Sequence, residues 1–180
     1  MFDFTDPIRW QVTLAAVAAI TLGLLVLGWL IKMQRLPIQP ELKFEASDFT
    51  FIRWWTVVAG VIGLVCPAIA LIVYRHHSDI QLFWGIYLLV LIIQISTETG
   101  FSRLFSSSMV VPIGTVYTLF RLWQLWMGRS LLLANSSLEN YSAVFSNSLW
   151  WLSSLFWLSN LIMLLVFAWP RISQPLDSKL

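Results

Sequence analysis

The chain has 180 residues, of which 58% are apolar and only 11% are charged, and its mean hydropathy is +0.78. A soluble domain carries about 25% charged residues, so this composition excludes an ordinary water-soluble protein and predicts an integral membrane protein in contact with a lipid bilayer. A net charge of only +2, with no basic run, argues against a nucleic-acid partner. The single cysteine, Cys66, excludes an internal disulfide and a multi-thiolate metal site.

Three segments have the length and the aromatic edges of transmembrane helices. Trp10 and Trp29 lie 19 positions apart, which corresponds to about 28 Å of α-helix and to the thickness of a bilayer core. Trp prefers the membrane–water interface, so such pairs mark the two ends of a span. The three predicted spans are residues 11–31 (edges Trp10 and Trp29), residues 55–73 (edges Trp54, Trp55 and Tyr74) and residues 151–169 (edges Trp151 and Trp169).

Two further segments are apolar but carry polar residues. Residues 80–97 can span the membrane if Thr97 or Glu98 lies at the interface. On a helical wheel, residues 109–127 form an amphipathic helix that either spans with its polar face toward other helices or lies in the interface plane. Its polar face holds Gly114, Tyr117, Thr118, Arg121, Gln124 and Gly128, and its apolar face holds Val116, Leu119, Phe120, Trp123, Trp126 and Met127.

The sequence therefore predicts an all-α fold, a single membrane domain over residues 1–180 with four or five transmembrane helices. With either number, the basic residues divide seven to four in favour of the inside. Both topologies place the N-terminus outside and the connection between the first two spans inside. They differ in the side of the C-terminus, and the apolarity of residues 109–120 favours five spans.

Polar residues within the spans are the candidate site. Gln94 and Glu98 lie one helical turn apart, and Glu98 is the one acidic residue close to a transmembrane core. They form either a proton or cation site, or a helix end in which Glu98 pairs with Arg103 or accepts hydrogen bonds from Ser96 and Thr97. Arg121, with Tyr117 and Gln124, either binds an anionic headgroup or acidic cofactor, or snorkels to the interface beside Trp123 and Trp126. A direct pair between Glu98 and Arg121 is not expected in a spanning helix.

Catalytic and cofactor signals are weak. His76 and His77 are the only histidines, so a bis-His haem within one chain is excluded and a solvated pair at the membrane edge is favoured over a metal site with Asp79. The sequence has no phosphate-binding Gly-rich loop and no plausible Ser/His/Asp or Cys/His set. We therefore expect a protein without catalytic residues, cofactor or metal, and a non-enzymatic role is favoured.

Small residues recur at four-residue spacing and predict close helix packing. One stripe contains Ala15, Ala19 and Gly23 in the first span. Another contains Ala59 and Gly63 in the second span and continues to Pro67. Such faces let helices approach closely, either inside the bundle or between copies or subunits. Packing inside the bundle is the favoured alternative, and a second copy or another membrane subunit is the possible partner.

Two short motifs stand out in the middle of the chain. The first is Gln94-Ile-Ser-Thr-Glu98, and the second is Phe120-Arg121-Leu122-Trp123-Gln124-Leu125 with Gly128. Together they resemble a family of small multi-pass membrane proteins from cyanobacteria and related photosynthetic lineages. The motifs and the gap between them cover about a fifth of the chain. The resemblance implies a bacterial plasma membrane or a thylakoid membrane and no particular activity.

These observations lead to two functional hypotheses. The first is a structural, assembly or interaction subunit that packs through its small-residue faces. The second is a small transporter or channel that uses Gln94 and Glu98. A membrane enzyme ranks third because the sequence has no catalytic set.

Overall fold

The computed structural model describes residues 7–39, 41, 46–133 and 140–173. Throughout these residues the regular elements are helices, and no strand occurs among them. The predicted all-α fold is therefore confirmed. The elements are α1 (Pro7–Lys32), α2 (Ala46–Gly60), the π-helical turn η1 (Val61–Val65), α3 (Cys66–Val73), α4 (Ser78–Leu104), the 3-10 turn η2 (Ser107–Met109), α5 (Val110–Leu133), α6 (Asn140–Met163), the π-helical turn η3 (Leu164–Ala168) and α7 (Trp169–Ile172).

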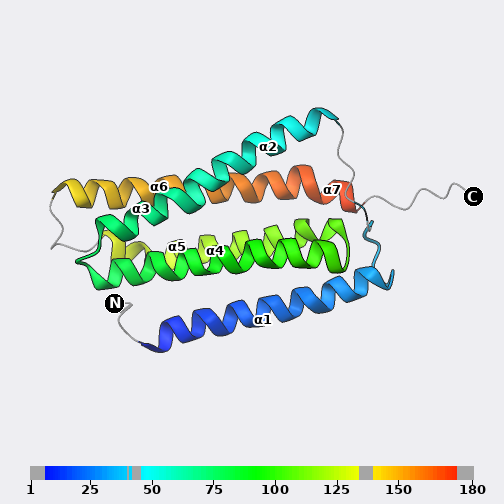
Figure 1. The fold of residues 1–180 in the computed structure, drawn as a ribbon, viewed down its shortest axis with the longest axis horizontal. Coiled ribbons are helices and arrows are strands. Elements are labelled where there is room, and N and C mark those ends of the chain that lie inside the picture. The colour runs from blue at the N-terminus through cyan, green and yellow to red at the C-terminus, as the bar shows by residue number, and fades with distance from the viewer. Residues whose placement is uncertain (1–6, 40, 42–45, 134–139, 174–180) are drawn as a thin grey trace, which may run out of the picture.

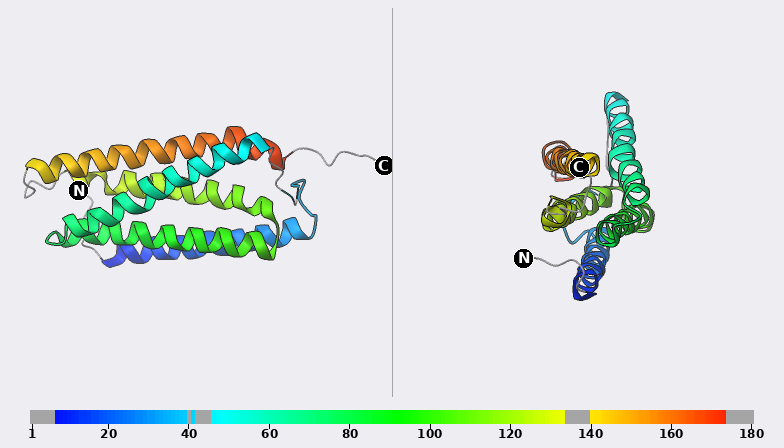
Figure 2. Two further views of the ribbon diagram at one scale, coloured as in Figure 1. Left: turned by 45° about the horizontal axis from the view of Figure 1, so that its top comes forward. Right: turned by 90° about the vertical axis from the view of Figure 1, so that its left-hand side faces the viewer.

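The helices form five long rods that run side by side along the long axis of the molecule (Figures 1 and 2). Two of the rods are composite, because α2, η1 and α3 are continuous, as are α6, η3 and α7. In Figure 1, α1 lies at the edge of the bundle beside α4. Helix α5 contacts α1, α4 and α6.

Both π-helical turns precede a proline by the same number of residues. Proline lacks the N–H that an α-helix needs, and its ring clashes with the carbonyl oxygen four residues earlier. The helical turn just before Pro67 and Pro170 contains one extra residue, so its hydrogen bonds span five residues instead of four. The Cys66 N–H donates to the Val61 carbonyl, and the Trp169 N–H donates to the Leu164 carbonyl. The two rods thus continue through their prolines instead of ending there.

Four helices are long and apolar enough to cross a membrane, which makes the chain a multi-pass membrane protein. They cover Trp10–Lys32, Thr50–Val73, Ser78–Leu104 and Ala143–Ile172, as judged over the described residues. Helix α5 is not among them, yet it runs parallel to them between α4 and α6 (Figure 2). An orientation in the plane of the interface, one of the two alternatives for residues 109–127, does not agree with this packing.

Several predicted bounds were too short. Helix α2 begins nine residues before the predicted start of its span, and α4 continues to Leu104. The expected polar connection over residues 32–53 is therefore partly helical. An ion pair between Asp48 of α2 and Arg171 of α7 holds this additional helix against the C-terminal rod. Trp54 and Trp55 marked the expected interface in the sequence, but they lie within the helix rather than at its start.

The two small-residue stripes behave differently. Gly63 and Pro67 are buried, and a Cβ added at Gly63 would lie 3.0 Å from the Trp157 indole of α6. By contrast, Ala15, Ala19 and Gly23 are exposed on α1, and nothing lies within 4 Å of a Cβ added at Gly23. Packing of this first stripe inside the bundle, the favoured alternative, is therefore wrong for the described residues, because α1 turns a different face inward. Packing against another chain remains a prediction.

Gly28 provides the close approach that α1 makes to the rest of the bundle. A Cβ at this position would lie 2.6 Å from Cδ2 and 2.9 Å from Cγ of Phe105, near the root of the ring. We expect Gly28→Ala to lower the free energy of unfolding by about 1–3 kcal/mol, because the ring cannot rotate out of this overlap. Thermal unfolding in detergent measures the loss. Gly23→Ala is the matched control, with an expected change within about 0.5 kcal/mol, and an equal effect of the two substitutions would contradict the packing.

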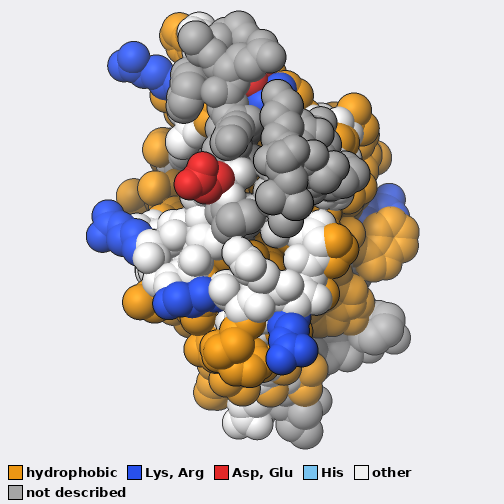
Figure 3. Space-filling model, turned by 90° about the vertical axis from the view of Figure 1, so that its right-hand side faces the viewer, with side chains coloured by type: hydrophobic (Ala, Val, Ile, Leu, Met, Phe, Trp, Pro, Cys, Tyr) orange, Lys and Arg blue, Asp and Glu red, His pale blue; other side chains and the backbone are white. Residues whose placement is uncertain are grey.

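Basic side chains gather at one end of the bundle. This end contains the C-terminal ends of α1 and α4 and the start of α2, and Figure 3 shows Lys and Arg side chains around its rim. The basic residues described there are Lys32, Arg35, Arg53, Arg103 and Arg171, against Arg9, Arg75 and Arg129 at the other end. Cytoplasmic loops carry the excess of Lys and Arg, so we expect the end with Lys32 and Arg35 to face the cytoplasm.

Because α5 packs alongside the four apolar helices, we expect it to cross the membrane as a fifth span, which would place the two ends of the chain on opposite sides. We therefore expect a reporter fused to the C-terminus to be active in the cytoplasm and the same reporter at the N-terminus to be active outside. Paired alkaline phosphatase and fluorescent-protein fusions measure this directly. Two termini on one side would show that one rod, most simply α5, does not cross.

A buried arginine centre and its cavity

Arg121 lies near the middle of α5 and is completely buried, at 0% exposure. Its guanidinium donates two hydrogen bonds to one atom, Oε1 of Gln94 on α4, from Nε at 3.0 Å and from Nη2 at 3.0 Å. A charge this far from water is stable only if polar partners replace the lost hydration. Gln94 is the first of these partners, and its contact joins α4 to α5.

Two aromatic rings supply the remaining stabilisation. The guanidinium carbon of Arg121 lies 5.0 Å from the centroid of the Tyr87 ring and 4.7 Å from that of the Trp157 ring. The negative face of an aromatic ring attracts a cation, and the attraction is strongest where water is absent. Trp157 Nε1 also donates a hydrogen bond to the Tyr87 hydroxyl, which fixes both rings. Nη1 of Arg121 has no hydrogen-bond partner among the described residues.

The amide of Gln94 connects the arginine to Glu98. While its oxygen accepts from Arg121, its nitrogen donates to Oε1 of Glu98 at 2.7 Å. The amide dipole therefore points its negative end at the cation and its positive end at the carboxylate. As expected, Glu98 and Arg121 form no direct ion pair: the one ion pair between described residues joins Arg171 and Asp48. They interact through Gln94 instead.

The structure corrects part of the earlier interpretation of these two residues. Arg121 neither snorkels to the interface nor reaches a headgroup, because it points into the bundle while Trp123 and Trp126 are exposed on the opposite face. The Ser96 and Thr97 hydroxyls do not bond to Glu98, since they donate to the carbonyls of Ile92 and Ile93. For Arg121 the reason is that α5 presents its polar face to α4, so its hydrogen-bond acceptor comes from a neighbouring helix. Glu98 instead accepts from Gln94, one turn earlier on its own helix.

The other predicted site residues lie elsewhere. Tyr117 shares the polar face of α5, but its hydroxyl forms a hydrogen bond with Thr21 of α1 at 2.8 Å. Gln124 is buried beside a different cavity, near the other end of the bundle. Gln94, Glu98 and Arg121 are thus the three predicted residues that the structure brings together.

A cavity of about 340 Å³ lies beside Glu98, in the half of the bundle nearer the basic end. Its walls come from α2 and η1, α4, α5, and α6 with η3, and they are mostly apolar. The residues that line it include Trp55, Thr56, Leu91, Gln94, Ile95, Glu98, Val111, Gly114, Trp157, Asn160, Leu164 and Phe167. Gly114 helps to form the space, since a Cβ there would lie 3.8 Å from Oε1 of Glu98 and 3.4 Å from Leu164.

Glu98 is the one charged group in the lining of this cavity. Asn160 also lines it, but its amide is already used: its oxygen accepts from Trp55 Nε1 at 2.8 Å, and its nitrogen donates to the Thr118 hydroxyl at 2.9 Å. The Thr56 hydroxyl likewise donates to the Ile52 carbonyl. The carboxylate of Glu98 retains the largest acceptor capacity of these polar groups, because its two oxygens can accept about four hydrogen bonds and Gln94 provides the one that comes from the described residues.

Reasoning from sequence missed Tyr87 and Trp157. Both are aromatic residues in the middle of a span, whereas Tyr and Trp prefer the interface. Their position in the middle of a span was the signal that could have identified them. A buried Trp or Tyr needs a partner for its N–H or O–H, so such residues indicate a polar contact inside the bundle. None of the described residues forms a metal-binding group of three, and His76 is exposed beside Arg75.

In comparisons with known proteins, no family model matches the chain, and no curated protein or solved structure shows significant similarity to it.

The pairing of Arg121 with Gln94 can be tested by removing one partner and then both. We expect Gln94→Leu to lower the free energy of unfolding by about 2–4 kcal/mol, because it leaves a buried charge without its acceptor. Adding Arg121→Met to Gln94→Leu should restore at least half of this loss, since the charge is then absent too. Thermal unfolding in detergent provides the comparison, with the exposed Gln81→Leu as the control. Additive losses in the double variant would refute the pairing.

Proposed function

We propose that the protein is a non-enzymatic membrane subunit that binds an amphipathic molecule in the cavity beside Glu98. The molecule has an apolar body and a head that donates a hydrogen bond, either a hydroxyl or a protonated amine. The observation that carries this proposal is one carboxylate with unused acceptor capacity in a cavity with mostly apolar walls. This is an interaction role, in agreement with the first of the two functional hypotheses.

The position of the cavity supports entry from the lipid. Helix α3 packs against α4, whereas α2 diverges from α4 toward the basic end of the bundle (Figure 1). Exposed residues lie on both sides of this divergence, with Leu64 on η1 and Ile95 on α4. Both also line the cavity. An apolar molecule dissolved in the bilayer therefore has a path between α2 and α4 that does not pass through water.

The chemistry of the walls selects the ligand. A buried carboxylate without enough donors is unfavourable, and a donor or a cation that reaches it removes that penalty. An anionic head would instead repel Glu98. Apolar ligand sites in proteins commonly consist of hydrophobic walls with a few convergent polar groups, and this cavity has that character.

A small transporter or channel that uses Gln94 and Glu98 is the alternative function. Conduction needs a polar path that continues beyond Gln94 toward the other end of the bundle. That space holds Arg121 between the rings of Tyr87 and Trp157, all of them buried. This packing favours binding over conduction.

We also infer that the protein resides in a bacterial plasma membrane or a thylakoid membrane of a cyanobacterial lineage. The support is the resemblance of the motif with Gln94 and Glu98, and of the motif with Arg121 and Gln124, to a family of such membrane proteins. These motifs include three residues that meet at the arginine centre, namely Gln94, Glu98 and Arg121.

The binding role is tested with photoreactive amphiphiles that differ only in their heads. Protein in lipid nanodiscs is labelled with diazirine derivatives of dodecylamine, dodecanol and dodecanoate, and the labelled residues are mapped by mass spectrometry. We expect the amine and the alcohol, but not the carboxylate, to label the helices around the cavity. In Glu98→Gln, labelling by the amine should fall about tenfold, the effect of losing roughly 1.5 kcal/mol from a charged hydrogen bond.

Glu41→Gln, which changes an exposed acid, is the matched control and should leave the labelling unchanged. Equal labelling by all three heads, or an unchanged pattern in Glu98→Gln, would overturn the binding role. A proton or cation flux into liposomes that Glu98→Gln abolishes without loss of folding would establish the transporter instead.

A further inference from the structure

A second cavity, of about 210 Å³, lies between α1, α4 and α5 at the end of the bundle opposite the basic residues. Trp10, Val12 and Thr13 line it from α1, and Asp79, Leu82, Phe83 and Ile86 from α4; Trp123, Gln124 and Met127 complete it from α5. Its segment of α4 precedes the one beside Glu98, and the two cavities share no lining residue. It is therefore independent of the function proposed above.

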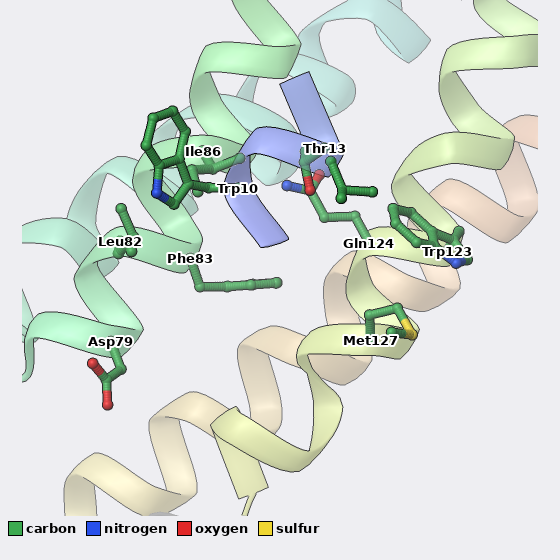
Figure 4. Close-up of a pocket in the computed structure, with 10 residues that line it drawn as sticks. Trp10, Thr13, Asp79, Leu82, Phe83, Ile86, Trp123, Gln124 and Met127 are labelled. Carbon is green, nitrogen blue, oxygen red and sulfur yellow. The ribbon is translucent and has the colours of Figure 1, made fainter. Parts of the chain in front are cut away.

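Gln124 is the unusual residue in this cavity. Its side chain is 5% exposed, and its Oε1 is buried without a hydrogen-bond partner among the described residues. Figure 4 shows the side chain extending from α5 toward Thr13 of α1, across the space that the aromatic and aliphatic residues surround. A buried acceptor without a partner is unfavourable, and it is rare in folded proteins unless a ligand or water satisfies it.

The other lining groups define what can satisfy this acceptor. Trp10, Phe83 and Trp123 offer ring surface, and Leu82, Ile86 and Met127 offer aliphatic surface. Asp79 is the one charged residue of the lining and lies in the first turn of α4, at the membrane edge. A carboxylate at this position repels anions, so a fatty acid or another acidic amphiphile is excluded by its charge.

We propose that this cavity binds a small apolar molecule without negative charge that donates one hydrogen bond, from a hydroxyl or an N–H, to Oε1 of Gln124. The apolar body lies against Phe83 and Met127, and the donor reaches the one acceptor that the protein leaves unsatisfied. Since Trp10 is exposed and Trp prefers the interface, such a molecule enters from the outer surface of the bilayer. Both a lipid-soluble alcohol and a small heteroaromatic amine have this chemistry.

Two isomeric ligands distinguish binding through a hydrogen bond from partitioning driven by apolar surface alone. Octan-1-ol and heptyl methyl ether have the same atoms, but only the alcohol is a donor. Protein in phosphatidylcholine nanodiscs is photolabelled with an octanol that carries a diazirine, and each unlabelled isomer competes at equal concentration in the membrane. We expect labels within residues 10–13, 82–86 and 123–127, competition about tenfold stronger by the alcohol than by the ether, and none by octanoate.

Gln124→Met distinguishes a binding role from a structural one. The substitution keeps the length of the side chain and removes the unsatisfied acceptor, so the unfolding temperature should stay the same or rise while the preference for the alcohol disappears. Gln81→Met, an exposed glutamine on α4, is the control that should retain the preference. If instead both isomers compete equally with the wild-type chain, the proposal is wrong, and this comparison does not depend on the folding of any variant. Labels confined to other residues would also overturn it.

Discussion

The structure depends on one requirement: the guanidinium of Arg121 must remain charged at the centre of an apolar bundle. Arginine keeps its proton in proteins, so burial cannot be relieved by neutralisation. The charge is stabilised by a hydrogen bond to the amide oxygen of Gln94 on α4 and by two aromatic ring faces, those of Tyr87 on α4 and Trp157 on α6. All three groups must approach one point together. This requirement fixes how far α4, α5 and α6 are shifted relative to one another along the bundle axis. Purely apolar packing would determine these shifts less sharply.

Helix α5 is the least apolar of the five rods and yet packs against three of the others, α1, α4 and α6. Its hydroxyl and amide groups bond to its neighbours: Tyr117 to α1, Thr118 to Asn160 of α6, and Thr115 to Trp169 of α7. Asn160 in turn accepts from Trp55 of α2, so every rod of the described chain is connected to α5 directly or through one residue. A helix with this many polar groups is compatible with a bilayer only when other helices surround it.

The sequence predicted the faces of the helices better than their partners. Because a helix repeats every 3.6 residues, the polar face of residues 109–127 was visible on a wheel, and Arg121 and Gln124 are indeed buried. The contact between Arg121 and Gln94 was not predictable, because periodicity within one helix does not specify which neighbour it meets or at what height. The same limit explains the exposed stripe at Ala15: small residues permit close packing but do not require it.

The position of the arginine centre also determines where the bundle has space. Around Arg121 the helices are held together by Gln94, Tyr87 and Trp157, and all four side chains are buried. Toward each end of α4 this polar contact no longer constrains the packing, and a cavity occurs on each side, one beside Glu98 and one beside Gln124. A centre closed by these buried side chains is poorly suited to conduct a solute across the membrane. It agrees with the two ligand sites proposed above, one in each half of the bundle, because the centre keeps the helices in register whether or not either site is occupied.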